Sequence, residues 1–113
     1  MGDTPMSDVR GLINGYVAEA RVDFVGLWQI AQRVRVDGRL CNWEAVRDVC
    51  LQVVYGLIDK GLQPGDYDMG GGFSPWSGAK ADSLARIRLE WDALRGPPTI
   101  LHPICWLRLM PPT

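Results

Sequence analysis

The stretch NWEAVRDVCLQVVYGLIDKGLQPGD, residues 42–66, decides the fold of this chain. Asn42 is a residue type favoured at helix N-caps, and the apolar residues after it recur with the three- and four-residue spacing of a helix that buries one face. Gly61 can adopt the left-handed conformation that ends a helix, and Pro64 prevents the helix from continuing. The stretch therefore predicts a helix that leads directly into a short strand. The predicted buried positions are Val46, Val49, Cys50, Val53, Val54, Leu57 and Ile58.

Similar signals predict three further helices and a second strand. Ser7 and Asp23 can cap two helices before this stretch, and Ser77 can cap one after it. The sequence Gly-Pro-Pro at 96–98 ends the last helix, and the apolar tail that follows is typical of a strand, which we expect to pair with residues 62–68. The predicted helices are 8–20, 24–36, 43–60 and 78–95, and the predicted strands are 62–68 and 103–109.

These elements predict a single compact α+β domain over residues 1–113. It should be rich in helix, with a winged-helix-like helix–helix–strand core and a small antiparallel sheet. A chain of 113 residues has the common size of one domain, and no internal repeat divides it. We expect residues 62–76 to form a loop or a hairpin. The terminal strand could be an open sheet edge that pairs with a partner or with a second copy, as in a homodimer.

Charge and composition narrow the class of protein. The chain has 12 basic and 13 acidic residues, nearly balanced in both halves, so no basic segment is present to attract nucleic acid. Residues 1–5 lack the features of a secretory signal, and no apolar run approaches the ~20 residues needed to span a bilayer. Three cysteines without a close pair suit reduced thiols. We therefore expect a cytoplasmic protein that has no membrane or nucleic-acid partner.

The residue types used in metal sites and in covalent catalysis form no recognised motif here. The three cysteines and the single histidine lack a Cys-x2-Cys knuckle, so they would make a zinc site or a nucleophile pair only if the fold brings them together. The segment 66–73 lacks both the glutamate of a calcium loop and the Lys-Ser/Thr ending of a phosphate loop. We predict a protein that is not an enzyme and has no cofactor. The cysteines and histidine are Cys41, Cys50, Cys105 and His102.

Aromatic and acidic residues are the candidate partner contacts. Trp76 follows a glycine-rich loop, where an aromatic side chain either packs on the sheet or faces a partner; packing is the commoner role. The same loop and the polar face of the fourth predicted helix carry carboxylates. The candidate partner-binding residues are Asp66, Asp68, Trp76, Glu90 and Asp92.

The order of these features resembles small uncharacterised bacterial proteins, some encoded beside polymorphic or contact-dependent toxins as cognate immunity proteins. The similarity covers residues 23–109. It implies a protein that neutralises one toxin by binding it, with no chemistry of its own, and it assigns no functional residues. The features are Asp37-Gly38, Asn42-Trp43-Glu44, Leu57 to Leu62, Pro64-Gly65-Asp66, Gly71 to Trp76, Trp91 and Cys105-Trp106-Leu107.

A toxin-binding immunity protein is therefore the predicted function. A mildly acidic inhibitor suits a basic nuclease toxin, because complementary charge speeds association. The first alternative is a winged-helix DNA-binding regulator in which the helix from Trp43 reads the DNA. That helix has two basic and three acidic residues, so phosphate contacts would depend on Arg33, Arg35 and Arg39. The second alternative is an enzyme or metal protein that uses His102 with a cysteine.

Overall fold

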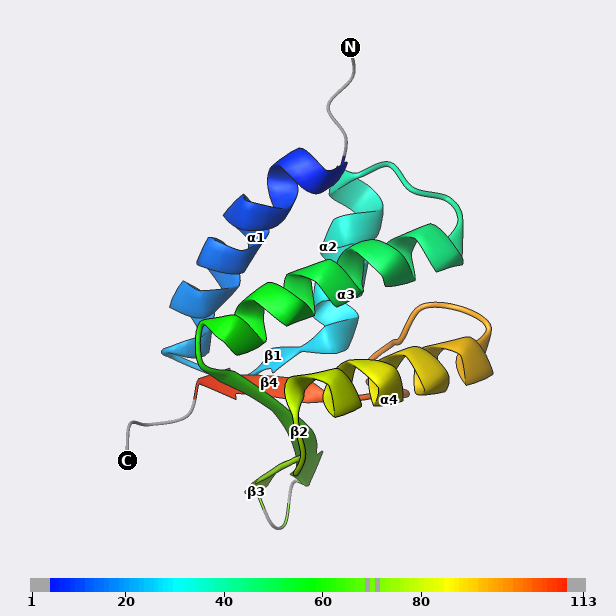
Figure 1. Cartoon of the computed structure of the whole chain (residues 1–113). Helices are drawn as coiled ribbons and strands as arrows, with labels where there is room; N and C mark the ends of the chain where they lie inside the picture. The colour runs from blue at the N-terminus through cyan, green and yellow to red at the C-terminus, as the bar shows by residue number, and fades with distance from the viewer. Residues whose placement is uncertain (1–4, 69, 71, 110–113) are drawn as a thin grey trace.

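The chain folds into helices packed on one small antiparallel sheet (Figure 1). This computed structural model describes residues 5–68, 70 and 72–109, and it confirms the predicted α+β class. The elements in chain order are α1 (Pro5–Ala20), β1 (Val25–Gly26), α2 (Leu27–Asp37), α3 (Trp43–Asp59), β2 (Leu62–Asp68), β3 (Gly72–Pro75), α4 (Lys80–Leu94) and β4 (Trp106–Leu109).

The central helix is α3, which packs against the other three helices and against β2. The Asn42 side chain caps it by accepting hydrogen bonds from the backbone N–H of Glu44 at 2.8 Å and of Ala45 at 3.2 Å. Six of its seven predicted stripe residues are buried, and Ile58 packs against them. Gly61 adopts the predicted left-handed conformation, with φ of +100°, and β2 begins at the next residue. The predicted helix–helix–strand core is present as α2, α3 and β2.

The strand order in the sheet is β1-β4-β2-β3, and every neighbouring pair is antiparallel. The predicted pairing of the terminal strand with residues 62–68 is confirmed. The expectation that this strand is an open edge is wrong, because β4 lies between β1 and β2. The edges are instead the two-residue β1 and the four-residue β3, and short edge strands offer little backbone for pairing with another chain.

The second helix begins three residues later than predicted. Val25 and Gly26 pair with β4 as a short strand, and the backbone N–H of Leu27 donates to the carbonyl of Cys105 at 3.1 Å. Asp23 therefore does not cap α2; its carboxylate accepts from the N–H of Phe24 at 2.7 Å. Pairing with a strand 80 positions away is a tertiary contact that the local pattern does not encode.

Two other predicted caps are also wrong. The first helix begins at Pro5, so Ser7 lies inside it. The fourth helix begins at Lys80 rather than after Ser77, and the side chain of Asp82 accepts from the N–H of Ala79 at 3.1 Å. Each of these helices is present, and only its end differs from the prediction.

The segments before and after α4 also differ in detail. β2 and β3 pair as a hairpin, one of the two expected possibilities for this segment. The last strand starts at Trp106 instead of 103, because Ile104 is left-handed (φ of 65°) and the N–H of Cys105 turns back to the carbonyl of Pro103 at 2.7 Å. That backbone is not extended, so it cannot join the ladder.

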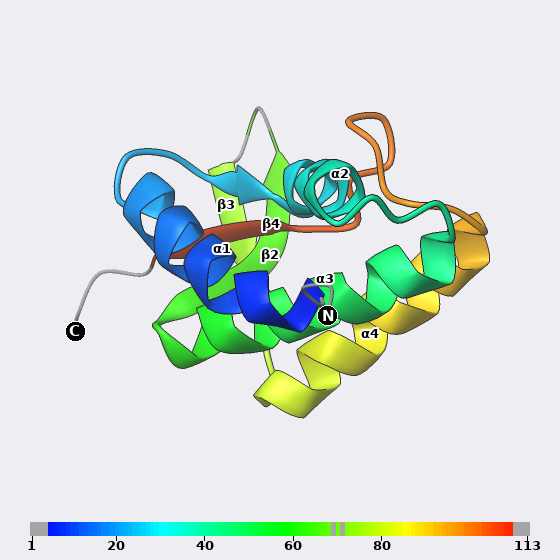
Figure 2. The same ribbon diagram turned by 90° about the horizontal axis from the view of Figure 1, so that it is seen from above.

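The hydrophobic core lies between the sheet and the helices. In Figure 1, α1, α2 and α3 lie above β1 and β4, while β2 and β3 extend below them. Figure 2 shows α3 and α4 running side by side, with α2 on the other side of β4. Ile87 and Trp91 of α4 are fully buried in this core, whereas Leu94 is 37% exposed because the helix ends there.

Candidate partner-binding surface

The sheet has a second face, which looks away from the helices. In the strand register, Trp106 lies opposite Gly26 on one side and Gly65 on the other, and Tyr67 lies opposite Phe73. Residues directly opposite in antiparallel strands share a face, and neighbours along a strand alternate between faces. Because Leu107, the neighbour of Trp106, is buried on the helix side, the aromatic residues point to the other side.

The rings on this second face contact one another. The ring centroid of Phe24 lies 4.9 Å from that of Tyr67 and 5.6 Å from that of Phe73. The centroids of Tyr67 and Trp106 are 6.0 Å apart, and the Arg108 guanidinium lies 5.4 Å from the Phe24 centroid. These separations are favourable for aromatic pairs and for a cation over a ring. We call Phe24, Tyr67, Phe73, Trp106 and Arg108 the outer aromatic face.

Two glycines allow these rings to lie close over the strands. A Cβ atom on Gly26 would lie 2.9 Å from Cζ3 of Trp106, and one on Gly65 would lie 2.7 Å from Cζ of Phe73. Real Cβ atoms do not approach other atoms so closely, and the rings cover the backbone that glycine leaves bare. The rings stay partly exposed, and Tyr67 is 41% exposed. Phe24 precedes β1 and belongs to this outer face through its contacts with Tyr67 and Phe73.

Two of the predicted acidic contacts lie on the opposite face of the β2–β3 hairpin, and a third, Glu90, lies beside it on α4. Asp66 and Asp68 alternate with Tyr67 along β2, so they point away from the outer aromatic face. The Arg86 guanidinium of α4 lies 3.8 Å from the carboxylate of Asp66 and donates to that of Glu90 at 2.8 Å. Asp66 and Glu90 also line a pocket of about 430 Å³ together with His102. The structure thus brings Asp66 and Glu90 together, with Asp68 farther along the hairpin.

The structure places Trp76 in the core. It is 6% exposed, and the Arg86 guanidinium lies 3.8 Å from its ring centroid. Its backbone N–H donates to the carbonyl of Pro64 at 2.9 Å, and its own carbonyl accepts from the side chain of Gln63 at 2.7 Å. Of the two predicted roles, this geometry matches packing on the sheet, because it leaves little of the ring for a partner to touch.

Asp92 takes part in an ion pair that joins two helices. Its carboxylate lies 2.6 Å from the guanidinium of Arg47 on α3, which also pairs with Asp48 at 3.0 Å and lies 5.8 Å from the ring centroid of Trp43. Arg47 is only 9% exposed although it carries a charge. The hydrogen bond to Asp92 raises the pKa of Arg47, so the guanidinium stays charged. Asp92 therefore connects α4 to α3, away from Asp66 and Glu90.

The three cysteines and the histidine do not converge on a metal-binding arrangement. Among the described residues, no group of three histidine, cysteine or carboxylate side chains could hold a metal ion. Cys50 and Cys105 are buried, and burial raises the pKa of both thiols, which suppresses the reactive thiolate. Cys41 is exposed, and His102 lies in the acidic pocket beside α4.

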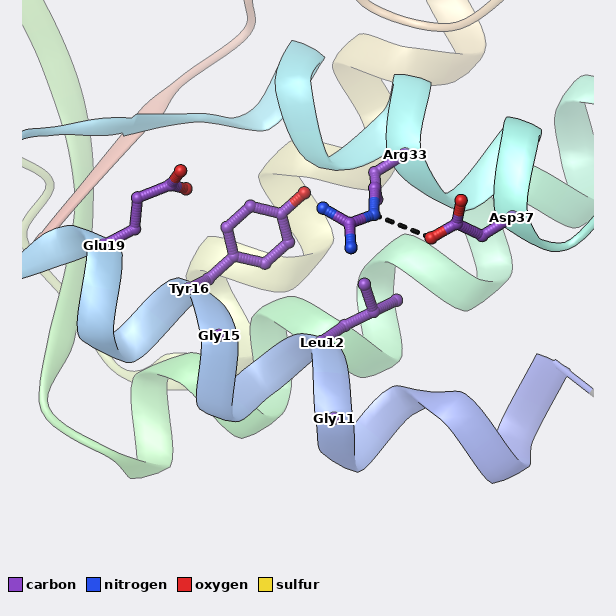
Figure 3. Close-up of a pocket in the computed structure, with 7 residues that line it drawn as sticks. All are labelled: Gly11, Leu12, Gly15, Tyr16, Glu19, Arg33 and Asp37. Carbon is purple, nitrogen blue, oxygen red and sulfur yellow. Dashed lines mark hydrogen bonds and ion pairs between the residues drawn. The ribbon is translucent and has the colours of Figure 1, made fainter.

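A polar groove of about 550 Å³ separates α1 from α2 (Figure 3). The Tyr16 side chain points from α1 toward the Arg33 guanidinium of α2, whose Nε bonds the carboxylate of Asp37 at 2.7 Å. Burial raises the pKa of Tyr16 to about 12, although nearby Arg33 opposes the shift. The hydroxyl is thus a neutral hydrogen-bonding group at physiological pH. The residues that line this groove can hold a polar ligand, but they include no nucleophile beside a base.

The chain matches no protein-family model, and comparison with curated proteins and with solved structures finds no similar protein. In the part of the chain that the structure describes, no helix combines the length and apolar character needed to cross a membrane. Sequence reasoning missed the outer aromatic face. The local signal for this face was the alternation of Tyr67 with two aspartates. The other aromatic residues come next to Tyr67 only through strand pairing.

Proposed function

We propose that this chain is a non-catalytic protein-binding module, an immunity protein that neutralises a cognate bacterial toxin by direct binding, and that it docks through the outer aromatic face. The observation that carries this proposal is the placement of four aromatic rings and an arginine on the solvent side of the sheet. Aromatic residues and arginine are the residue types that dominate binding energy at protein interfaces. Apolar groups that gather on a protein surface often mark interaction sites.

The charge around the hairpin supports a basic partner. Asp66 and Asp68 lie on the hairpin face opposite Tyr67, and both are exposed. A partner that binds both faces of the hairpin would contact aromatic rings on one face and carboxylates on the other. Carboxylates at the rim steer a basic surface, such as that of a nuclease toxin, and raise its association rate more than its final affinity. Asp66, Asp68 and Glu90 are the acidic contacts of this proposal.

The alternative is a DNA-binding regulator that reads DNA with α3. The stripe of α3 that remains exposed weighs against this function, because it carries three carboxylates and no basic residue. A net-negative stripe repels the phosphate backbone, which normally supplies most of the affinity for DNA. Salt-dependent retention on duplex DNA would favour the regulator instead. The exposed stripe consists of Glu44, Asp48, Gln52, Tyr55 and Asp59.

The test uses the product of a neighbouring toxin gene. The toxin domain is expressed in cells with or without this protein, and the affinity of the purified pair is measured. Tyr67→Ala removes an exposed ring from the outer aromatic face. Tyr55→Ala is the matched control, because Tyr55 is 50% exposed but lies on α3, on the helix side of the sheet. We expect the first variant to weaken binding by about tenfold or more, a loss of at least ~1.4 kcal/mol, and the second to leave it unchanged.

The outcomes test the immunity function and the proposed binding surface separately. If the folded protein does not protect cells from any neighbouring toxin, the immunity function is wrong. If it protects, but Tyr67→Ala protects and binds equally well, the function stands and the outer aromatic face is not the interface. A concentration-dependent doubling of mass in light scattering that Tyr67→Ala abolishes would instead assign this face to a homodimer.

A further inference from the structure

A second pocket lies between α2, the first turn of α3 and the loop that follows α4. Its volume is about 600 Å³, within the range of pockets that hold small organic molecules. The indole rings of Trp28 and Trp43 line it together with aliphatic and proline side chains. Flat aromatic walls of this kind favour a flat ring as ligand.

The charged groups that line this pocket are all of one sign. They are Arg35, near the end of α2, and Arg95, at the end of α4. Both side chains are exposed, and within the described part of the chain neither forms an ion pair with a carboxylate. The α1–α2 groove differs, because Glu19 and Asp37 line it beside its arginine. Two guanidinium groups without carboxylate partners are donors available for an acidic ligand.

The backbone at the rim of the pocket keeps one of these arginines in an unfavourable conformation. Arg95 is left-handed, with φ of 56°, at the position where α4 ends. Glycine is the usual residue at such a helix end, and here glycine comes one position later, as Gly96. A left-handed arginine is strained, and strain of this kind concentrates at functional sites.

We propose that this pocket binds a planar aromatic ring that carries a carboxylate or a phosphate. The two indoles contact the ring, and Arg35 and Arg95 bind the acidic group. This proposal does not rest on the proposed toxin-binding function.

Cys41 provides a reporter for the occupied pocket. It lines the pocket and is exposed, whereas Cys50 and Cys105 are buried, so the native chain has a single rapidly alkylated thiol. The alkylation rate with iodoacetamide, an uncharged reagent, is measured by mass spectrometry while the ligand concentration rises. The aromatic acids are indole-3-acetate, which carries a carboxylate, and adenosine 5′-monophosphate, which carries a phosphate. Their uncharged counterparts are indole-3-acetamide and adenosine.

We expect at least one acid to slow alkylation of Cys41 saturably, and its uncharged counterpart to bind at least tenfold more weakly. The acid that protects more strongly identifies the acidic group of the ligand. Arg35→Gln and Arg95→Gln should each weaken protection by about tenfold, because each removes a charge-assisted hydrogen bond. Arg88→Gln is the matched control, since Arg88 is an exposed arginine of α4 that does not line this pocket.

Three results would overturn the proposal. The first is the absence of protection by either acid up to about 5 mM, a concentration that fills most sites of 1 mM affinity. The second is equal protection by an acid and its uncharged counterpart. The third is a loss of protection in Arg88→Gln that equals the loss in Arg35→Gln and Arg95→Gln. Isothermal titration calorimetry of the same acid with the native protein checks that slower alkylation reflects binding.

Discussion

The two faces of this small sheet carry different kinds of side chain. The inner face buries aliphatic side chains such as Val25, Leu62 and Leu107, which have no polar atoms and are at most 2% exposed. The outer face holds both phenylalanines of the chain, a tyrosine and a tryptophan, which remain partly exposed. Helices cover the inner face, so shape complementarity decides its residues. None of the four helices that the structure describes covers the outer face, so large flat rings shield the strands there.

This difference separates the residues that stabilise the fold from the residues that we propose bind a partner. Leu107 and Trp106 are neighbours in β4, yet one packs against the helices and the other lies on the outer aromatic face. A substitution on the inner face should therefore change the free energy of unfolding. A substitution on the outer face should mainly change partner affinity. The predictions below test this division, beginning with the largest expected change.

Trp76→Ala tests whether Trp76 contributes to folding stability or to partner affinity. Because Trp76 is buried beneath Arg86, we expect a loss of about 3–5 kcal/mol in the free energy of unfolding. The indole Nε1 has no hydrogen-bond partner among the described residues, so the loss comes from packing. Urea denaturation measures the loss, with Trp76→Phe as a milder variant. A stable Trp76→Ala protein with weakened partner binding would place this ring among the recognition residues.

Leu107→Ala should lower the free energy of unfolding by about 2–5 kcal/mol, because it opens a cavity at the centre of the inner face. The outer-face comparison is Tyr67→Ala, which removes a larger side chain that is 41% exposed, and there we expect a clearly smaller loss. Thermal and urea unfolding give both values. Equal losses for the two variants would contradict the division between the faces.

Alkaline pH should lower the free energy of unfolding, because it deprotonates a tyrosine that burial keeps neutral. Burial raises the pKa of Tyr16 from 10.0 to about 12, so the unfolded chain releases this proton at a lower pH than the folded one. The stability that the neutral tyrosine contributes is therefore complete below pH 10 and is lost as the pH rises through 12. The loss is at most about 2–3 kcal/mol, reduced to the extent that water in the groove reaches the hydroxyl.

The tyrosine contribution must be separated from that of the buried thiols, Cys50 and Cys105, whose raised pKa values act in the same direction. Tyr16→Phe removes only the tyrosine titration. Urea denaturation of both proteins between about pH 8 and pH 11 should show a shallower decline for the variant. Parallel declines in the two proteins would mean that the Tyr16 hydroxyl is well solvated when folded.

The features that sequence alone predicted well are those with local causes. The α3 stripe, its Asn42 cap and its left-handed Gly61 depend on residues within a few positions of one another, and all three are present. The pairing of the last strand with β2 followed from an apolar tail that needed a partner and from the extended segment that follows α3. The short β1 was not predicted, because two residues carry no periodic pattern.

The candidate site was less predictable, because its geometry depends on contacts between distant segments. Asp66 and Glu90 come together through Arg86: its pair with Glu90 has the i,i+4 spacing of a helix, but its contact with Asp66 depends on how α4 packs beside the hairpin. Asp92 faces α3 instead, because the ion pair with Arg47 spans 45 positions of sequence. The outer aromatic face combines residues from three strands and a loop, and their common orientation is fixed by strand register rather than by local pattern.

The smallest expected effect concerns two arginines that each lie over an aromatic ring. Arg86 lies 3.8 Å from the buried Trp76 ring and also pairs with Glu90, whereas Arg108 lies 5.4 Å from the Phe24 ring on the outer face. Arg108→Gln should change the free energy of unfolding by less than about 1 kcal/mol, the size of an exposed cation–π contact. Arg86→Gln should cost more, because it loses a closer ring contact and an ion pair together. Urea denaturation ranks the two variants, and a larger loss for Arg108→Gln would show that the outer face stabilises the fold as much as the inner one does.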